Sequence, residues 1–143
     1  MPRRSSPRSL SPDEQHVLNV LLSRPFPGRD ELRTQVAHAR VVGLACDCGC
    51  PSVTLTVDRS AAPAPATGMV VDGVGLDADG NALGVLLFVG DDGYLAELEI
   101  YSAAGETVGM PTVQSFALAE WESQGHGGAM LKNPPRGTTG HPV

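Results

Sequence analysis

From residue 40 onward, apolar and polar residues alternate along the chain, and this period of two is the feature that most restricts its possible folds. Successive side chains of an extended strand point to opposite faces, so the alternation predicts a sheet with one buried face and one solvated face. Gly, Asp, Asn and Pro divide the region into candidate strands. The five expected strands are 40–45, 53–58, 69–77, 83–89 and 94–102.

Two short turns join the last three of these strands. Residues 78–81 (Ala-Asp-Gly-Asn) and 90–93 (Gly-Asp-Asp-Gly) have Gly or Asn where a hairpin needs a positive φ, so we expect consecutive antiparallel hairpins, that is, a meander. Residues 85–89 are apolar at every position, which places this strand in the middle of the sheet with helices covering one side. Residues 116–121 fit a last strand or a short helix, and we favour an edge strand.

Two helices are expected before the strands. Ser11 can cap the first helix and Glu14 can complete a capping box. The helix should end near residue 24, because the prolines at 25 and 27 cannot continue it. Its apolar stripe is Val17, Leu18, Leu21 and Leu22.

Gly28 precedes a second helix with acidic residues in its first turn. Its inner stripe is Leu32, Gln35, Val36 and Ala39.

These patterns together predict an α+β fold. An N-terminal αα-hairpin is expected to pack on one face of a five- to six-stranded antiparallel meander sheet, with residues 11–123 forming a single domain. Residues 1–10 are rich in Arg, Ser and Pro, and residues 124–143 are rich in Gly and Pro. Such compositions bury too little apolar surface to offset the entropy of ordering. We therefore expect a disordered basic tail at the N-terminus and a disordered Gly/Pro-rich tail at the C-terminus.

The charge of the chain restricts its partners. The sequence has 16 acidic and 10 basic residues, and between residues 41 and 122 twelve acidic residues accompany Arg59 alone. A surface this negative repels phosphate groups, so we expect neither nucleic acid nor an anionic membrane as a partner.

No apolar run approaches the ~20 residues that cross a bilayer, and residues 1–11 lack a signal-peptide pattern. A cytoplasmic protein with a basic protein partner fits best.

Three cysteines at alternate positions, Cys46, Cys48 and Cys50, form the most unusual motif. An odd number of cysteines within five positions argues against a secreted disulfide framework and favours reduced thiols or a metal site. Alternate residues of a strand lie about 6.6 Å apart, whereas sulfurs on one zinc ion lie roughly 3.8 Å apart. A zinc site therefore requires the chain to curl and a fourth ligand such as His38. The other interpretations are a structural strand end and a redox or metal-trafficking thiol.

Glu97 and Glu99 form the second candidate site. In a regular strand they point to the same side as Leu95 and Tyr101. Paired carboxylates can act as acid and base, hold a cation or contact a partner protein. No His or Lys can be placed beside them from the sequence, so a hydrolytic enzyme is the weaker interpretation. Residues 77–81 resemble the start of a calcium loop, but the position of the glycine favours a hairpin turn.

The leading interpretation is therefore a non-enzymatic protein-interaction module that binds a basic protein partner, in a toxin-neutralising or regulatory role. Complementary charge speeds the encounter of two proteins and rejects wrong partners. The expected partner-binding residues are Glu97, Glu99, Asp91 and Asp92. No catalytic residue and no cofactor is assigned. The alternative is a zinc-binding or thiol-metal protein. Its expected ligands are Cys46, Cys48, Cys50 and His38.

Overall fold

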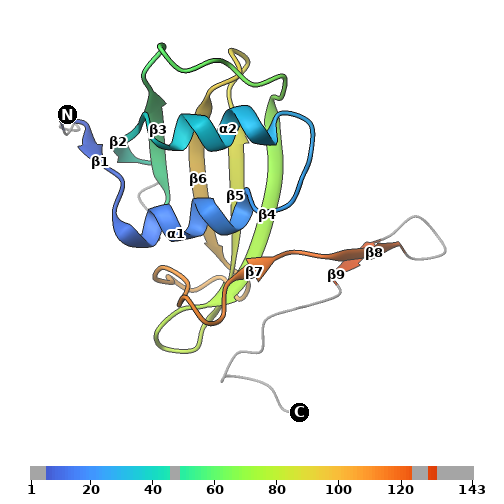
Figure 1. Ribbon diagram of the computed structural model, residues 1–143. Helices are drawn as coiled ribbons and strands as arrows, with labels where there is room; N and C mark the ends of the chain where they lie inside the picture. The colour runs from blue at the N-terminus through green and yellow to red at the C-terminus, as the bar shows by residue number, and fades with distance from the viewer. Residues whose placement is uncertain (1–5, 46–48, 124–128, 132–143) are drawn as a thin grey trace.

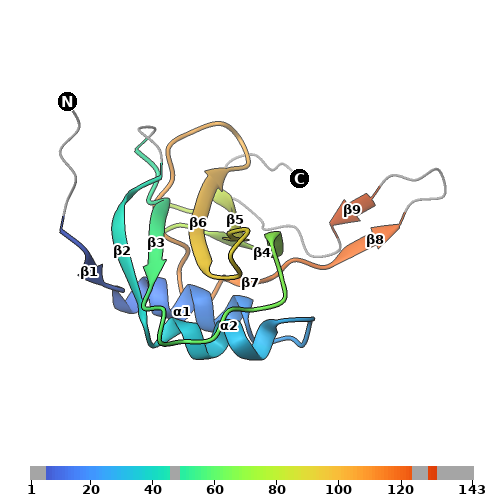
Figure 2. The ribbon, with the colours of Figure 1, turned by 90° about the horizontal axis from the view of Figure 1, so that it is seen from above.

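The computed structural model describes residues 6–45, 49–123 and 129–131. These residues form the helices α1 (Pro12–Leu21) and α2 (Arg29–Val36), which lie on the same face of the main sheet (Figure 1). Seen from above, no helix of these described residues lies on the opposite face of the sheet (Figure 2). The strands are β1 (Arg8–Ser9), β2 (Ala39–Leu44), β3 (Val53–Val57), β4 (Gly68–Leu76), β5 (Ala82–Val89), β6 (Leu95–Ser102), β7 (Ala117–Leu118), β8 (Trp121–Ser123) and β9 (Ala129–Leu131).

The main sheet has seven antiparallel strands in the order β1-β2-β3-β6-β5-β4-β7, which confirms an α+β fold with an antiparallel sheet. The predicted meander is wrong at one point, because β3 pairs with β6 and not with β4. The proline-rich connector 58–67 cannot continue a ladder and carries the chain along one end of the sheet to its far side (Figure 1). Strands β1, β2 and β3 are consecutive neighbours, as are β4, β5 and β6, and the two-residue strands β1 and β7 occupy the edges.

The first turn of α1 follows the predicted capping box. Ser11 Oγ accepts a hydrogen bond from Glu14 N (3.1 Å), and Glu14 Oε1 accepts one from Ser11 N (2.8 Å). Arg8 donates to both carboxylate oxygens of Glu14, at 3.0 and 2.9 Å. Burial alone would raise the pKa of Glu14, but the hydrogen bonds from Arg8 and Ser11 outweigh burial and lower it.

The folded chain begins earlier than the predicted boundary at Ser11. Arg8 and Ser9 pair with β2 at Val41 and Arg40, and Leu10 is buried in the core. Sequence reasoning placed these residues in a disordered tail because residues 1–10 show no apolar periodicity. The ordering comes from single contacts that leave no periodic signal: one ion pair, one buried leucine and a short stretch of ladder.

The hydrophobic core fills the space between the helices and the sheet. Leu18, Leu21 and Leu32 of the helices are fully buried. The strand predicted for the middle of the sheet is β5, which lies between β4 and β6. Its alternate residues Leu83, Val85, Leu87 and Val89 belong to the same buried cluster. The apolar face of the sheet is therefore the face that the helices cover.

Gln35 is the wholly buried polar residue of this core. Its Nε2 donates to the carbonyl oxygens of Ala62 (3.0 Å) and Gly93 (2.9 Å), and its Oε1 accepts a hydrogen bond from Leu95 N (2.9 Å). One side chain thus joins α2 to the connector 58–67 and to the turn between β5 and β6. A buried amide with all three of these partners is satisfied and fixes the distance between the elements that it joins.

The C-terminal part of the described chain contributes two further features. β7 pairs with β4 at Gly73 and Val74, so the edge strand favoured for residues 116–121 is confirmed at residues 117 and 118. β8 and β9 pair with each other as a separate two-stranded sheet, which extends away from the body in both views (Figures 1 and 2). Residues 129–131 of β9 fall within the segment predicted as a tail. The rest of that segment, 124–128 and 132–143, lies outside the described residues.

Gln35→Leu should destabilise the fold by about 3 kcal/mol, because it leaves the buried N–H of Leu95 unpaired and removes a hydrogen-bond donor from the carbonyl groups of Ala62 and Gly93. Urea unfolding followed by circular dichroism measures this change. Gln15→Leu on the exposed side of α1 is the matched control and should stay within about 0.5 kcal/mol of the wild type. Equal stabilities of the two variants would contradict the role assigned to Gln35.

Candidate functional site

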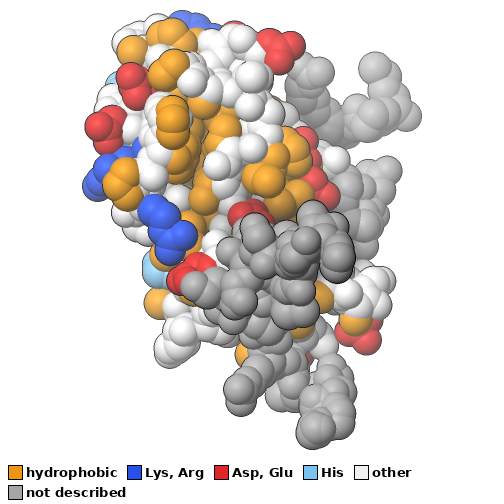
Figure 3. All heavy atoms as spheres, turned by 90° about the vertical axis from the view of Figure 1, so that its right-hand side faces the viewer, with side chains coloured by type: hydrophobic (Ala, Val, Ile, Leu, Met, Phe, Trp, Pro, Cys, Tyr) orange, Lys and Arg blue, Asp and Glu red, His pale blue; other side chains and the backbone are white. Residues whose placement is uncertain are grey.

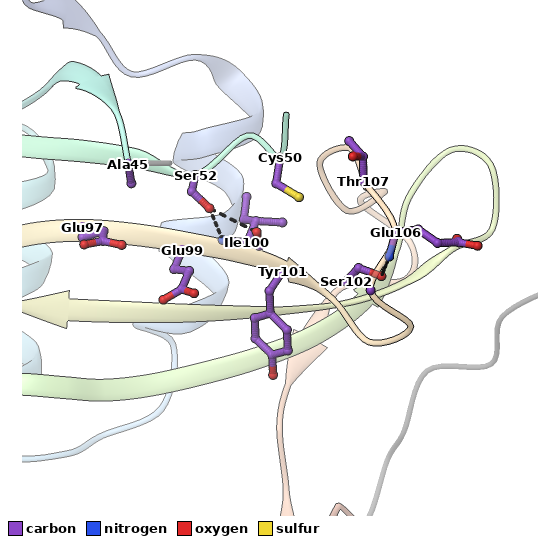
Figure 4. A pocket seen from close by; sticks show the side chains of 11 residues that line it. Ala45, Cys50, Ser52, Glu97, Glu99, Ile100, Tyr101, Ser102, Glu106 and Thr107 are labelled. Carbon is purple, nitrogen blue, oxygen red and sulfur yellow. Dashed lines mark hydrogen bonds between the residues drawn. The ribbon is translucent and has the colours of Figure 1, made fainter. Parts of the chain in front are cut away.

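The candidate site lies on the face of the sheet opposite the helices. Along β6, Leu98 and Ile100 are buried toward the helices, whereas Glu97, Glu99 and Tyr101 alternate with them on the open face. Figure 4 shows these three side chains in a row along the strand. The prediction that Leu95 shares their side is wrong. A bulge between the β5 pairs of Leu95 and Glu97 shifts the alternation, so Leu95 is buried on the helix side.

A pocket of about 400 Å³ opens beside this row (Figure 4). β6 forms one wall, the start of β3 forms another, and the loop after β6 forms the third. The side chains that define its chemistry are Cys50, Ser52, Glu97, Glu99, Tyr101 and Glu106. The structure therefore brings one cysteine of the sequence motif and both candidate glutamates into a single pocket.

Ser52 builds the inner wall of the pocket. It is 1% exposed, its Oγ donates to Ile100 O (3.1 Å), and the same oxygen accepts a hydrogen bond from Ile100 N (2.7 Å). A side-chain hydroxyl thus replaces backbone pairing at the point where residues 50–52 enter β3. This pair of bonds holds buried Cys50 beside β6, as Figure 4 shows. Sequence reasoning missed Ser52, because a serine at a strand end gives no signal of its own.

Tyr101 owes its position to a glycine. Gly84 of β5 pairs directly with Tyr101, and a Cβ built on Gly84 would overlap the phenol ring. The ring therefore lies flat across the backbone of β5, where only glycine leaves room. Burial raises the pKa of the Tyr101 hydroxyl, and the nearby carboxylates of Asp72 and Glu99 raise it further. The ring remains 41% exposed, so an aromatic surface stays available within an acidic environment.

The two glutamates are electrostatically unfavourable for the folded chain. Partial burial raises the pKa of Glu97, and the charge of Glu99 raises it further. In residues 6–45 and 49–123, no Arg or Lys forms an ion pair with either side chain. The ion pairs of this part of the chain are Arg8–Glu14, Arg24–Glu120, Arg29–Asp30 and Arg59–Asp92. Glu97 and Glu99 thus present negative charge that no described basic side chain balances.

Asp91 and Asp92 do not join this pocket. They lie on the turn between β5 and β6 and line a separate pocket of about 350 Å³. Arg59 Nη2 donates to Asp92 Oδ2 (2.8 Å), and Thr67 Oγ1 donates to Asp91 Oδ1 (3.1 Å). The Arg59 guanidinium also stacks on the ring of Tyr94, 3.9 Å from its centroid. Contacts within the chain therefore already engage both aspartates, which the sequence had grouped with Glu97 and Glu99.

The predicted metal ligands are not brought together in the described residues. Cys46 and Cys48 lie outside them. His38 precedes β2, next to the end of β3, where its carbonyl accepts a hydrogen bond from Asp58 N (3.1 Å). Cys50 precedes β3 at the opposite end of the β2–β3 ribbon. Among residues 6–45, 49–123 and 129–131, no group of three His, Cys, Asp or Glu side chains is arranged to hold a metal ion.

Asp77 forms a structural turn and also supports the site. Its Oδ1 accepts hydrogen bonds from the backbone N–H groups of Asp79 and Asn81, both at 2.9 Å. Its Oδ2 accepts one from Gly109 N (3.1 Å), in the segment that follows the pocket wall at Glu106. Burial would raise the pKa of Asp77, but these bonds lower it. The carboxylate thus closes a hairpin turn and anchors the loop after β6.

Glu97→Gln should raise the stability of the protein at neutral pH. Because folding raises the pKa of Glu97, the unfolded state loses this proton first as pH rises, and the charged form then disfavours folding. Glu97 is partly exposed, so solvent screening limits the gain to at most about 1 kcal/mol. The gain should disappear below about pH 4, where both states are protonated.

Thermal unfolding at neutral and at acidic pH measures this difference. Glu106→Gln, an exposed carboxylate at the rim of the same pocket, is the control and should leave stability within about 0.5 kcal/mol. A Glu97→Gln variant that is less stable than the wild type at neutral pH would show that this carboxylate makes a favourable internal contact.

Comparison with other proteins does not add to this geometry. No protein-family model, no curated protein sequence and no solved structure matches the chain. Neither α1 nor α2, the helices of the described part of the chain, is long and apolar enough to span a membrane. Fold class alone does not imply an activity, so the functional argument rests on the side chains of the pocket and of the open face.

Proposed function

We propose that the chain is a non-enzymatic, cytoplasmic protein-interaction module that binds a basic protein. The binding surface is the acidic face, which we define as Glu97, Glu99 and Tyr101 of β6 together with the pocket beside them. One observation carries the proposal. Two carboxylates share an open sheet face without a described basic partner, and folding raises the pKa of one of them. A cationic partner would remove this unfavourable repulsion.

The composition of the acidic face favours a protein partner. Tyrosine supplies a large, rigid contact area at low entropic cost and is enriched in protein interfaces. Tyr101 offers such a surface between β5 and β6. A lysine or arginine side chain that enters the pocket would meet both glutamates and the phenol ring of Tyr101. Carboxylates and an aromatic face both attract such a cation.

The charge of the sheet region supports the same partner. Complementary long-range charge raises association rates, whereas buried contacts mainly set dissociation rates. Glu97 and Glu99 are therefore expected to speed the encounter, and Tyr101 to prolong the complex. A module that covers the basic surface of another protein also blocks the contacts of that surface. This blocking is the physical basis of a toxin-neutralising or regulatory role.

The test compares three variants with the wild type for binding to one purified partner. Partners retained from cell extract by the immobilised chain are identified, purified and measured by surface plasmon resonance at low and high salt. Replacing Glu97 and Glu99 together by Gln should lower the association rate constant about tenfold at low salt. Tyr101→Ala should raise Kd about tenfold, mainly through faster dissociation.

The matched control replaces Asp91 and Asp92 together by Asn. This change removes the same charge from a turn whose aspartates already have contacts within the chain. Its association rate constant should stay within about threefold of the wild type, because the charges lie outside the binding pocket. A purified partner that is acidic, or an association rate that does not change with salt, would contradict the proposal.

A further inference from the structure

A second surface, separate from the acidic face, lies along the outer edge of β4. β7 covers this edge only at Gly73 and Val74, and Ala119 N donates to Asp72 O (3.0 Å) at the end of the covered part. Beyond Asp72, the described residues supply no strand partner for the outer side of positions 68–71. Within the described part of the chain, the edge of the sheet is therefore unpaired over the first residues of β4.

The open part of the edge is apolar. Met69 is 50% exposed, and Val70 and Val71 are partly exposed. Figure 3 looks onto the β4 side of the molecule and shows hydrophobic side chains gathered there, with acidic and basic groups beside them. An unpaired strand edge flanked by apolar side chains is a template for the addition of another strand.

The register of the sheet identifies β8 as the strand that fits this edge. β7 pairs Ala117 with Val74 and Leu118 with Gly73. Continuation of the same antiparallel register would place Trp121 opposite Val70 and Ser123 opposite Gly68. These two residues are the ends of β8. β8 thus has the position in sequence and the length needed to cover the open edge, although in this structure it pairs with β9 alone.

The chain leaves its own sheet at a fixed point. Ala119 is buried and its N–H donates to Asp72 O. Glu120 Oε2 lies 3.7 Å from Nη2 of Arg24, in the segment that follows α1. From there the β8–β9 hairpin extends away from the body (Figures 1 and 2). A two-stranded hairpin is marginally stable by itself in water, so it needs a surface to add to. The surface that matches the register of β8 is the outer edge of β4. Because the β8–β9 hairpin extends away from the body, it can reach this edge on a second copy of the chain.

We infer that two copies of this chain exchange their β8–β9 hairpins. The hairpin of each copy adds to the outer edge of β4 in the other copy, and the two exchanges are related by a twofold axis. The bulge between Met69 and Val71 increases the local twist of β4, which disfavours pairing with a long flat strand and suits a strand as short as β8. This inference does not depend on the proposed binding of a basic protein.

Light scattering after size-exclusion chromatography tests the exchange on the full chain. The wild type should have twice the chain mass of 14.9 kDa. Met69→Lys places a charge on the open edge and should give a monomer. Leu44→Lys is the matched control, because Leu44 is a comparably exposed apolar residue at the end of β2, and this variant should remain dimeric. Circular dichroism confirms that both variants are folded.

A mixing experiment separates hairpin exchange from other dimers. Glu122→Pro removes the central N–H of β8 and should also give a monomer, whereas Glu122→Ala should remain dimeric. A mixture of the Met69→Lys and Glu122→Pro monomers should form a heterodimer, because the first retains a working hairpin and the second a working edge. A monomeric wild type, or a mixture that stays monomeric, would overturn the inference. A Glu122→Pro variant that remains dimeric would also overturn the inference and would indicate direct β4–β4 pairing, which does not need β8.

Discussion

The fold depends on the hydrogen bonds of one buried side chain, Gln35 of α2. Three parts of the chain that are distant in sequence meet at its amide: the helix, the connector 58–67 and the turn that begins β6. The connector has no ladder of its own and buries only the small side chains of Ala61 and Ala64, yet it must cross the end of the sheet for β3 to pair with β6. Gln35 holds it there, together with the bond from Ala64 N to Gly93 O (2.8 Å). The strand order, and so the open face that β6 presents, follows from these contacts.

The candidate site likewise depends on residues that position other groups and are not themselves proposed to bind a partner. Ser52 replaces a stretch of ladder between β3 and β6, Gly84 lets the ring of Tyr101 lie across β5, and Asp77 anchors the loop beyond the pocket. Each is a small or polar residue whose contact lies across the sheet or in a distant loop. The glutamates supply the charge of the pocket, and these three residues decide which groups surround that charge.

The sequence predicted the helices and strands of the fold but not the order of the strands in the sheet. The capping box at Ser11, the apolar run of β5 and the glycine-containing turns are local signals, and each predicted its element correctly. The pairing of β3 with β6 depends on tertiary contacts around Gln35, which no local pattern encodes. The bulge before Glu97 likewise moved Leu95 to the buried face, because one inserted residue reverses an alternation that sequence reasoning takes as regular. Asp91 and Asp92 were grouped with the glutamates by charge alone, and only the structure shows Arg59 and Thr67 beside them.

The two faces of the sheet contribute differently to stability. The face under the helices stabilises the fold, whereas the open face carries the charges on which the proposed binding rests. The helix side gains free energy from buried leucine and valine side chains, and the amide of Gln35 within it is fully hydrogen-bonded. The open side retains the carboxylates of Glu97 and Glu99. Partial burial raises the pKa of Glu97 and the charge of Glu99 raises it further, so the ionised form of Glu97 lowers stability. Replacing these carboxylates by neutral residues would be a simple way to stabilise the fold. Their presence on a face that the core does not need is the physical basis for proposing a ligand of opposite charge.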